Sequence, residues 1–140
     1  MKKLISVRQA LEDPAWLGSM LGAESFAVMR TLLIAAMGEA LTAAEMHIFT
    51  QLTGRAETPG EAVEELWVIA GRRSGKTRAI GTLAAYLAGC CDYRAILGPG
   101  ERGVLPIMTA GTQASRATRY RCATALIFRS AQRVSAPFAA

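Results

Sequence analysis

The sequence has no acidic residue after Glu101, although it runs on to Ala140. This last stretch contains six arginines, and removing them from the sixteen basic residues of the chain leaves ten basic against eleven acidic residues in 1–101. The formal charge of +5 therefore belongs to the tail, while the main body carries a net charge of −1. A basic surface for nucleic acid is not expected on the body, and only the tail is a candidate for such contact.

Cysteine is scarce, with three residues in the chain. Cys90 and Cys91 are adjacent and Cys122 stands apart, which matches neither the ligand spacing of a metal site nor an even-numbered disulfide framework. Cys90 and Cys91 close a predicted helix, so we expect them to be buried structural residues in a reducing cytosol.

Long apolar runs are absent as well. The longest stretch near the N-terminus covers residues 32–37, far short of the roughly 20 apolar residues that span a bilayer. Charged residues follow closely on Met1, so the apolar centre of a signal peptide does not form. With 51% hydrophobic residues, the chain is expected to bury the core of one globular domain without a membrane segment.

A small helical segment is predicted over residues 1–64. A first helix, over 25–37, is indicated by apolar residues at spacings of three and four: Phe26, Met29, Leu33 and Met37. A second is expected to start at Thr42, which forms a capping box with Glu45, and to stop at Gly54. A turn-rich connector over 55–61 follows.

Residues 65–115 have the order expected of a parallel α/β unit. The apolar run 66–70, which includes Trp67, predicts a strand buried on both faces, and the periodicity of 77–87 predicts a helix that ends near Gly89. A second strand is expected over 104–108, weakened by Pro106. Strand, helix and strand imply a right-handed crossover with two parallel strands.

A phosphate-binding loop lies between the first strand and this helix. Its pattern, G-x-x-x-x-G-K-[ST], is met at every fixed position except the first by Ala70-Gly71-Arg72-Arg73-Ser74-Gly75-Lys76-Thr77. Glycines let the backbone amides turn inward toward phosphate oxygens, and the helix N-terminus adds further unpaired amides. Lys76 is then expected to bind the β- and γ-phosphates of ATP and Thr77 to bind Mg²⁺.

Two arginines inside the loop are unusual, because guanidinium groups add positive charge beside a triphosphate. Arg72 is a candidate arginine finger in cis, which would stabilise the transition state of hydrolysis. Arg73 is assigned to phosphate binding with Gly71, Ser74 and Gly75. Solvated loop arginines are the alternative interpretation for both.

These residues resemble the ATPase part of the large terminase subunit of tailed bacteriophages, the motor that packages DNA. The resemblance covers roughly residues 20–115 and rests on the missing first glycine, the loop arginine, and three flanking segments: residues 49–55 followed by Pro59, residues 96–104, and Thr112-Gln113-Ala114. It implies phage DNA, a portal protein and a small terminase subunit as partners in the cytoplasm of a bacterial host. It also implies that Gln51 and Arg55 lie near the adenine base, although both are equally consistent with surface positions on a capped helix.

The resemblance further implies carboxylates that this chain does not supply. Hydrolysis needs an acidic residue after a later strand, and the terminase nuclease binds metal through clustered carboxylates. The expected fold is therefore an incomplete P-loop NTPase domain that binds ATP without turnover. It is followed by an unassigned tail over 116–140, for which a frameshifted reading frame is one hypothesis. The alternatives are another P-loop NTPase, such as a helicase-like protein or a nucleotide kinase, and a non-enzymatic remnant whose basic tail contacts nucleic acid.

Overall fold

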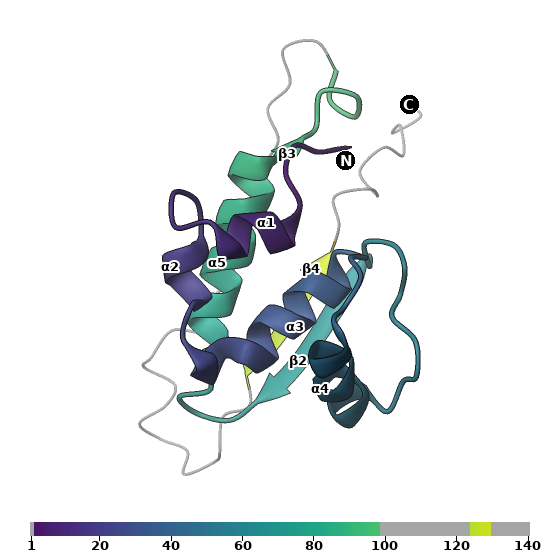
Figure 1. Ribbon diagram of the computed structural model, residues 1–140. Coiled ribbons are helices and arrows are strands. Elements are labelled where there is room, and N and C mark those ends of the chain that lie inside the picture. The colour runs from purple at the N-terminus through teal and green to yellow at the C-terminus, as the bar shows by residue number, and fades with distance from the viewer. Residues whose placement is uncertain (1, 99–123, 130–140) are drawn as a thin grey trace, which may run out of the picture.

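The computed structural model describes residues 2–98 and the backbone of 124–129 (Figure 1). The N-terminal part contains a short strand and a series of helices: β1 (Lys2–Lys3), α1 (Val7–Glu12), α2 (Gly18–Leu21), the 3₁₀ helix η1 (Glu24–Phe26), α3 (Ala27–Ala36) and α4 (Ala43–Thr53). It is followed by β2 (Glu65–Ala70), α5 (Lys76–Cys90), β3 (Cys91–Asp92) and β4 (Thr124–Arg129). The predicted strand at 104–108 and most of the tail lie outside the described residues.

The predicted limits of α4 are confirmed. The Thr42 hydroxyl accepts a hydrogen bond from the Glu45 amide at 3.3 Å, and the Glu45 carboxylate accepts one from the Thr42 amide at 2.8 Å. Gly54 ends the helix in the left-handed conformation, with a φ of 69°. Both signals depend only on residues within a few positions of each other, which is why the sequence sufficed.

Other helix limits were predicted less well. The first predicted helix is split, because η1 precedes α3 and α3 begins at Ala27. Helix α5 continues one residue past Gly89, to Cys90. Helix α1 was not predicted. Ser6 and Gln9 form a capping box at its start, and a serine followed three residues later by a glutamine is the sequence signature of that motif.

The strands of the described residues pair in antiparallel fashion. β2 pairs with β4 in a register that runs from Glu65 opposite Arg129 to Ala70 opposite Thr124. β1 pairs with β3, so that Lys2 lies opposite Asp92. The start of the chain therefore lies beside the strand that directly follows α5. The predicted parallel sheet depends on a strand at 104–108, and the parallel α/β fold therefore stays a prediction.

The prediction that β2 is buried on both faces is wrong. Its residues alternate, with Leu66 and Val68 half-buried while Trp67 and Ile69 are 58% and 78% exposed. Trp67 is therefore not a core residue, contrary to expectation. An apolar run predicts a strand, but only the elements packed against the strand determine which of its faces are covered.

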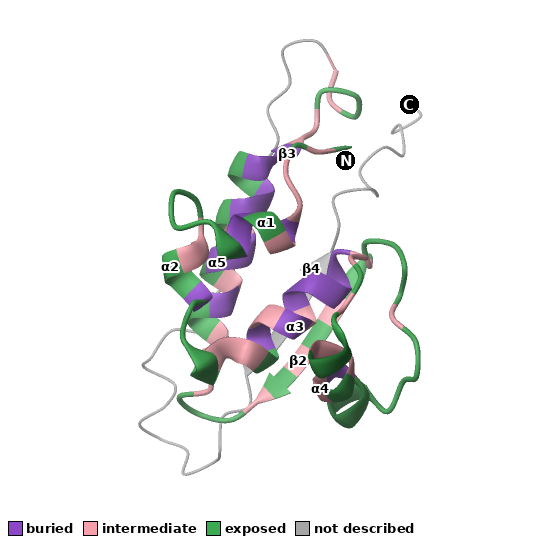
Figure 2. Cartoon of the chain, viewed as in Figure 1, coloured by how far each residue is buried: buried purple, intermediate pink, exposed green. Residues whose placement is uncertain are grey.

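The core lies between the N-terminal helices and α5. Figure 2 shows buried residues along α3 and α5, whereas the connector before β2 is mostly exposed. The predicted boundary near residue 64 follows this connector, yet one core joins residues from both sides of it: Val7, Leu11, Leu21, Leu33, Ile34, Met37, Leu83, Tyr86, Leu87, Cys90 and Cys91. The N-terminal helices and α5 thus stabilise each other by burying apolar surface together. No helix in 2–98 is long and apolar enough to cross a membrane.

An ion pair connects α1 to the start of α4. Arg8 donates two parallel hydrogen bonds to Glu45, at 3.0 and 2.7 Å, and a third to the carbonyl of Ala40 at 2.8 Å. Nearby, the Glu39 carboxylate accepts hydrogen bonds from the Val7 and Arg8 amides at 2.8 and 3.0 Å. The Arg8 guanidinium, with help from Thr42, lowers the pKa of Glu45 to about 2, from a usual value of 4.5.

This ion pair predicts a loss of stability in acid. The folded state lowers the pKa of Glu45 from 4.5 to about 2. The contribution of the ionised Glu45 to the free energy of unfolding is therefore complete above pH 4.5 and falls as the pH drops toward 2. We expect this loss to be about 2 kcal/mol, because both side chains stay partly exposed and solvent weakens the interaction. Urea unfolding between pH 7 and 2.5 measures it.

Two variants separate Glu45 from the other acidic groups. Glu45→Gln should lower stability at pH 7 and flatten its dependence on pH between 4.5 and 2.5. Glu57→Gln, in the exposed connector, is the matched control and should leave the profile unchanged. A Glu45→Gln profile as steep as that of the parent chain would contradict the assignment.

Candidate nucleotide-binding site

The predicted phosphate loop connects β2 to α5. β2 ends at Ala70, and α5 begins at Lys76, which confirms the predicted order of strand, loop and helix around residues 71–75 (Figure 1). The loop residues are exposed or half-buried. Local sequence determined this arrangement, because the apolar run and the helical periodicity adjoin the loop on its two sides.

The backbone of the loop turns through two residues in the left-handed region. Gly75 has a φ of 83°, which glycine adopts at little cost, and Arg73 has a φ of 63°, which is uncommon for a residue with a side chain. Gly75 is also the N-cap of α5, and no side chain caps that helix. Within residues 2–98, the N-cap residue thus offers the first amides of α5 no side-chain acceptor, and such amides attract anions.

Lys76 folds back over this loop. Its Nζ donates hydrogen bonds to the carbonyl oxygens of Ala70 at 2.8 Å and Gly71 at 2.5 Å, and it lies 3.4 Å from the hydroxyl of Ser74. The ammonium group is thus held by the carbonyl oxygens at the end of β2 and the start of the loop. A phosphate placed beside it would meet a positive charge and the amides of the helix N-terminus together.

Three other residues of the predicted site face solvent. Thr77, Arg72 and Arg73 are exposed, and no hydrogen bond or ion pair to their side chains is found within 2–98. They are thus accessible to a ligand at the loop. Their predicted roles, with Arg72 as the arginine finger and Thr77 at Mg²⁺, stay predictions.

The hydrogen bonds of Gln51 and Arg55 found within 2–98 are local. The Gln51 amide lies 3.5 Å from His47, one turn earlier in α4, and the backbone of Arg55 donates to the Thr53 hydroxyl at 3.2 Å. Within 2–98, no hydrogen bond or ion pair joins either side chain to residues 70–77. The structure does not bring them into contact with the loop, and their assignment to the adenine base stays a prediction.

Phe26 contacts the loop, and the sequence did not indicate this. A Cβ atom added to Gly75 would lie 2.6 Å from Cε1 of Phe26, and the Arg78 guanidinium lies 5.2 Å from the centre of the same ring. The helical spacing had placed Phe26 among the apolar residues of the first helix. No sequence pattern could reveal the contact, because it joins two segments far apart in the chain.

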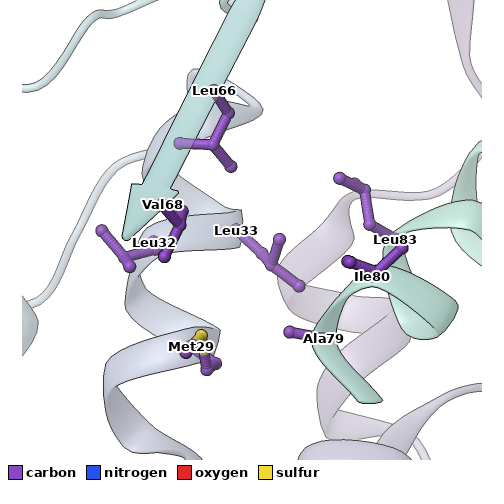
Figure 3. Close-up of a pocket in the computed structure, with 8 residues that line it drawn as sticks. All are labelled: Met29, Leu32, Leu33, Leu66, Val68, Ala79, Ile80 and Leu83. Atoms are coloured by element: carbon purple, nitrogen blue, oxygen red, sulfur yellow. The ribbon is translucent and has the colours of Figure 1, made fainter. Parts of the chain in front are cut away.

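The apolar gap between α3, β2 and α5 is too small for a ligand. Its volume is about 10 Å³, roughly the space of one water molecule. Figure 3 shows its lining, which includes Met29 and Leu33 from α3, Leu66 and Val68 from β2, and Ala79 and Leu83 from α5. It is a packing interface that holds β2 and α5 in place.

The cysteines are structural, as predicted for Cys90 and Cys91. Both are buried and free of disulfides, and burial raises the pKa of each thiol, which makes them poor nucleophiles. Cys122 lies outside the described residues. In the part of the chain that the structure describes, no group of three or more His, Cys, Asp or Glu residues is placed to hold a metal ion.

Comparisons of this chain with models of protein families, with curated proteins and with solved structures gave no match.

Proposed function

We propose that this chain binds ATP, with Mg²⁺, through the loop at residues 71–77. The observation that carries the proposal is the position of Lys76, the first residue of α5. Its Nζ donates hydrogen bonds to the carbonyl oxygens of Ala70 and Gly71, where β2 ends and the loop begins. A lysine at the start of a helix whose N-cap has no side chain to bond the first amides suits the binding of a triphosphate.

We further propose that the chain is related to the ATPase motor of a phage terminase. The support is the variant loop, with Ala70 in place of the first glycine and Arg72 within it, together with the flanking segments that resemble the family. On this proposal the chain acts in the cytoplasm of a bacterial host, with phage DNA, portal and small terminase subunit as partners. Because these 140 residues supply no carboxylate after Glu101, we propose binding without turnover.

The proposal is tested by calorimetric titration of the 140-residue chain with a non-hydrolysable ATP analogue. One site is expected, with tighter binding in the presence of Mg²⁺. Thr77→Ala should retain binding of the analogue but lose most of the gain from Mg²⁺, because the hydroxyl that meets the ion is gone.

The matched control is Thr50→Ala, an exposed threonine on α4, which should leave both affinities unchanged. Absence of binding to the parent chain at millimolar analogue would refute the proposed function. Binding with an unchanged Mg²⁺ response in Thr77→Ala would refute only the role of Thr77.

A further inference from the structure

Phe26 lies where the N-terminal helices meet the loop. It is the last residue of η1 and the N-cap of α3, and its amide donates to the carbonyl of Ala23 at 3.0 Å. The side chain is half-buried and packs against the core. The Phe26 backbone thus belongs to the helical segment, and its ring packs on the core that this segment shares with α5.

The Phe26 ring lies so close to Gly75 that a side chain at this position would overlap it. A Cβ on Gly75 would come within 2.6 Å of Cε1 and 3.0 Å of Cδ1 of Phe26, well inside van der Waals contact. Glycine is thus required here for its left-handed φ of 83° and also for the close approach of the ring. Gly75 is the residue at which the loop becomes helix α5.

Arg78 also interacts with the Phe26 ring. It lies on the first turn of α5, exposed, with its guanidinium 5.2 Å from the ring centre of Phe26. A cation over an aromatic face is attracted by the negative charge of the π system. One ring therefore touches the start of α5 at two positions, three residues apart, on one turn of the helix.

We infer that Phe26 is a positioning residue for the phosphate loop, keeping Gly75 and the first turn of α5 in the conformation that binds phosphate. The effect on affinity rests on the proposed function, whereas the effect on the loop does not. Without the ring, the loop samples other conformations, and the apparent affinity falls with the fraction of chains that are competent to bind. The helical segment is thereby part of the phosphate site through Phe26, although the Phe26 ring itself is not a ligand of the phosphate.

Hydrogen exchange of the loop amides tests the inference without nucleotide. In Phe26→Ala, the amides of residues 71–77 should exchange several-fold faster than in the parent chain, while Phe26→Tyr, which keeps the ring, should restore slow exchange. Leu41→Ala, at another partly buried residue packed on the same core, is the control for general destabilisation and should not accelerate these amides selectively. Equal exchange at 71–77 in Phe26→Ala and the parent would overturn the inference.

A second variant keeps the test decisive if Phe26→Ala fails to fold. Arg78→Gln changes an exposed residue and should accelerate the same amides in part, while Arg78→Lys, which keeps a cation, should not. Unchanged exchange in Arg78→Gln would then overturn the inference.

The consequence for binding is measured by calorimetry with the ATP analogue. Phe26→Ala should weaken affinity about three- to tenfold, in proportion to the lost contact, with Phe26→Tyr and Leu41→Ala close to the parent. An unchanged Kd in Phe26→Ala overturns the link to nucleotide affinity. A parent chain that does not bind the analogue refutes the proposed function, while faster exchange in Phe26→Ala would still support the positioning of the loop.

Discussion

Replacing Lys76 with alanine is expected to weaken binding of an ATP analogue by about thirtyfold or more. Lys76 is the only lysine that the loop pattern contains, and its Nζ lies against the carbonyl oxygens at the end of β2. Removing one member of a charge pair with phosphate costs about 2–5 kcal/mol, which corresponds to this loss of affinity.

The measurement is calorimetry with a non-hydrolysable analogue and Mg²⁺. Lys76→Met is the informative partner variant, because it keeps an apolar stem and removes the charge, and it should lose as much affinity as the alanine variant. Lys2→Ala, at an exposed lysine of β1, controls for the change in net charge. Affinity that stays unchanged in Lys76→Ala would rule out the phosphate role of this residue.

Replacing Tyr86 with alanine is expected to destabilise the fold by about 3–5 kcal/mol. Tyr86 is fully buried in the core between α5 and the N-terminal helices. Its hydroxyl donates a hydrogen bond of 2.7 Å to the carbonyl of Ile5, 81 positions earlier in the chain. Burial raises the pKa of this hydroxyl, so it stays protonated and able to donate at neutral pH.

Urea unfolding followed by far-UV circular dichroism measures this effect. Tyr86→Phe should cost less, about 1–2 kcal/mol, since it leaves the ring in place but deprives the Ile5 carbonyl of its donor. Trp16→Ala, at an aromatic residue that is 51% exposed, should change stability by less than about 1 kcal/mol. A Tyr86→Ala variant as stable as the parent would contradict the shared core.

The same contact explains why the N-terminal segment matters for the site. Tyr86 and Leu83 lie on α5, the helix that begins at Lys76, and they belong to one core with buried residues of α1, α2 and α3. Loss of this packing should therefore disturb the loop from the far end of the helix, just as loss of Phe26 disturbs it at the near end.

The sequence alone determined the local structure of this protein. The capping box of Thr42 with Glu45, the C-cap at Gly54 and the succession of β2, loop and α5 were predicted because each depends on residues within about four positions or on one periodic run. The same holds for Lys76 as the central residue of the candidate site, since its place in the loop follows from the glycine spacing.

Only the tertiary structure decided which segments meet. Phe26 on Gly75, Tyr86 with Ile5, and Arg8 with Glu45 join residues that lie tens of positions apart, and no spacing in the sequence encodes such contacts. The exposed face of β2 was mispredicted for the same reason, because burial depends on which elements pack against a strand. Long-range packing thus set the environment of a loop whose residues were already evident from their order in the chain.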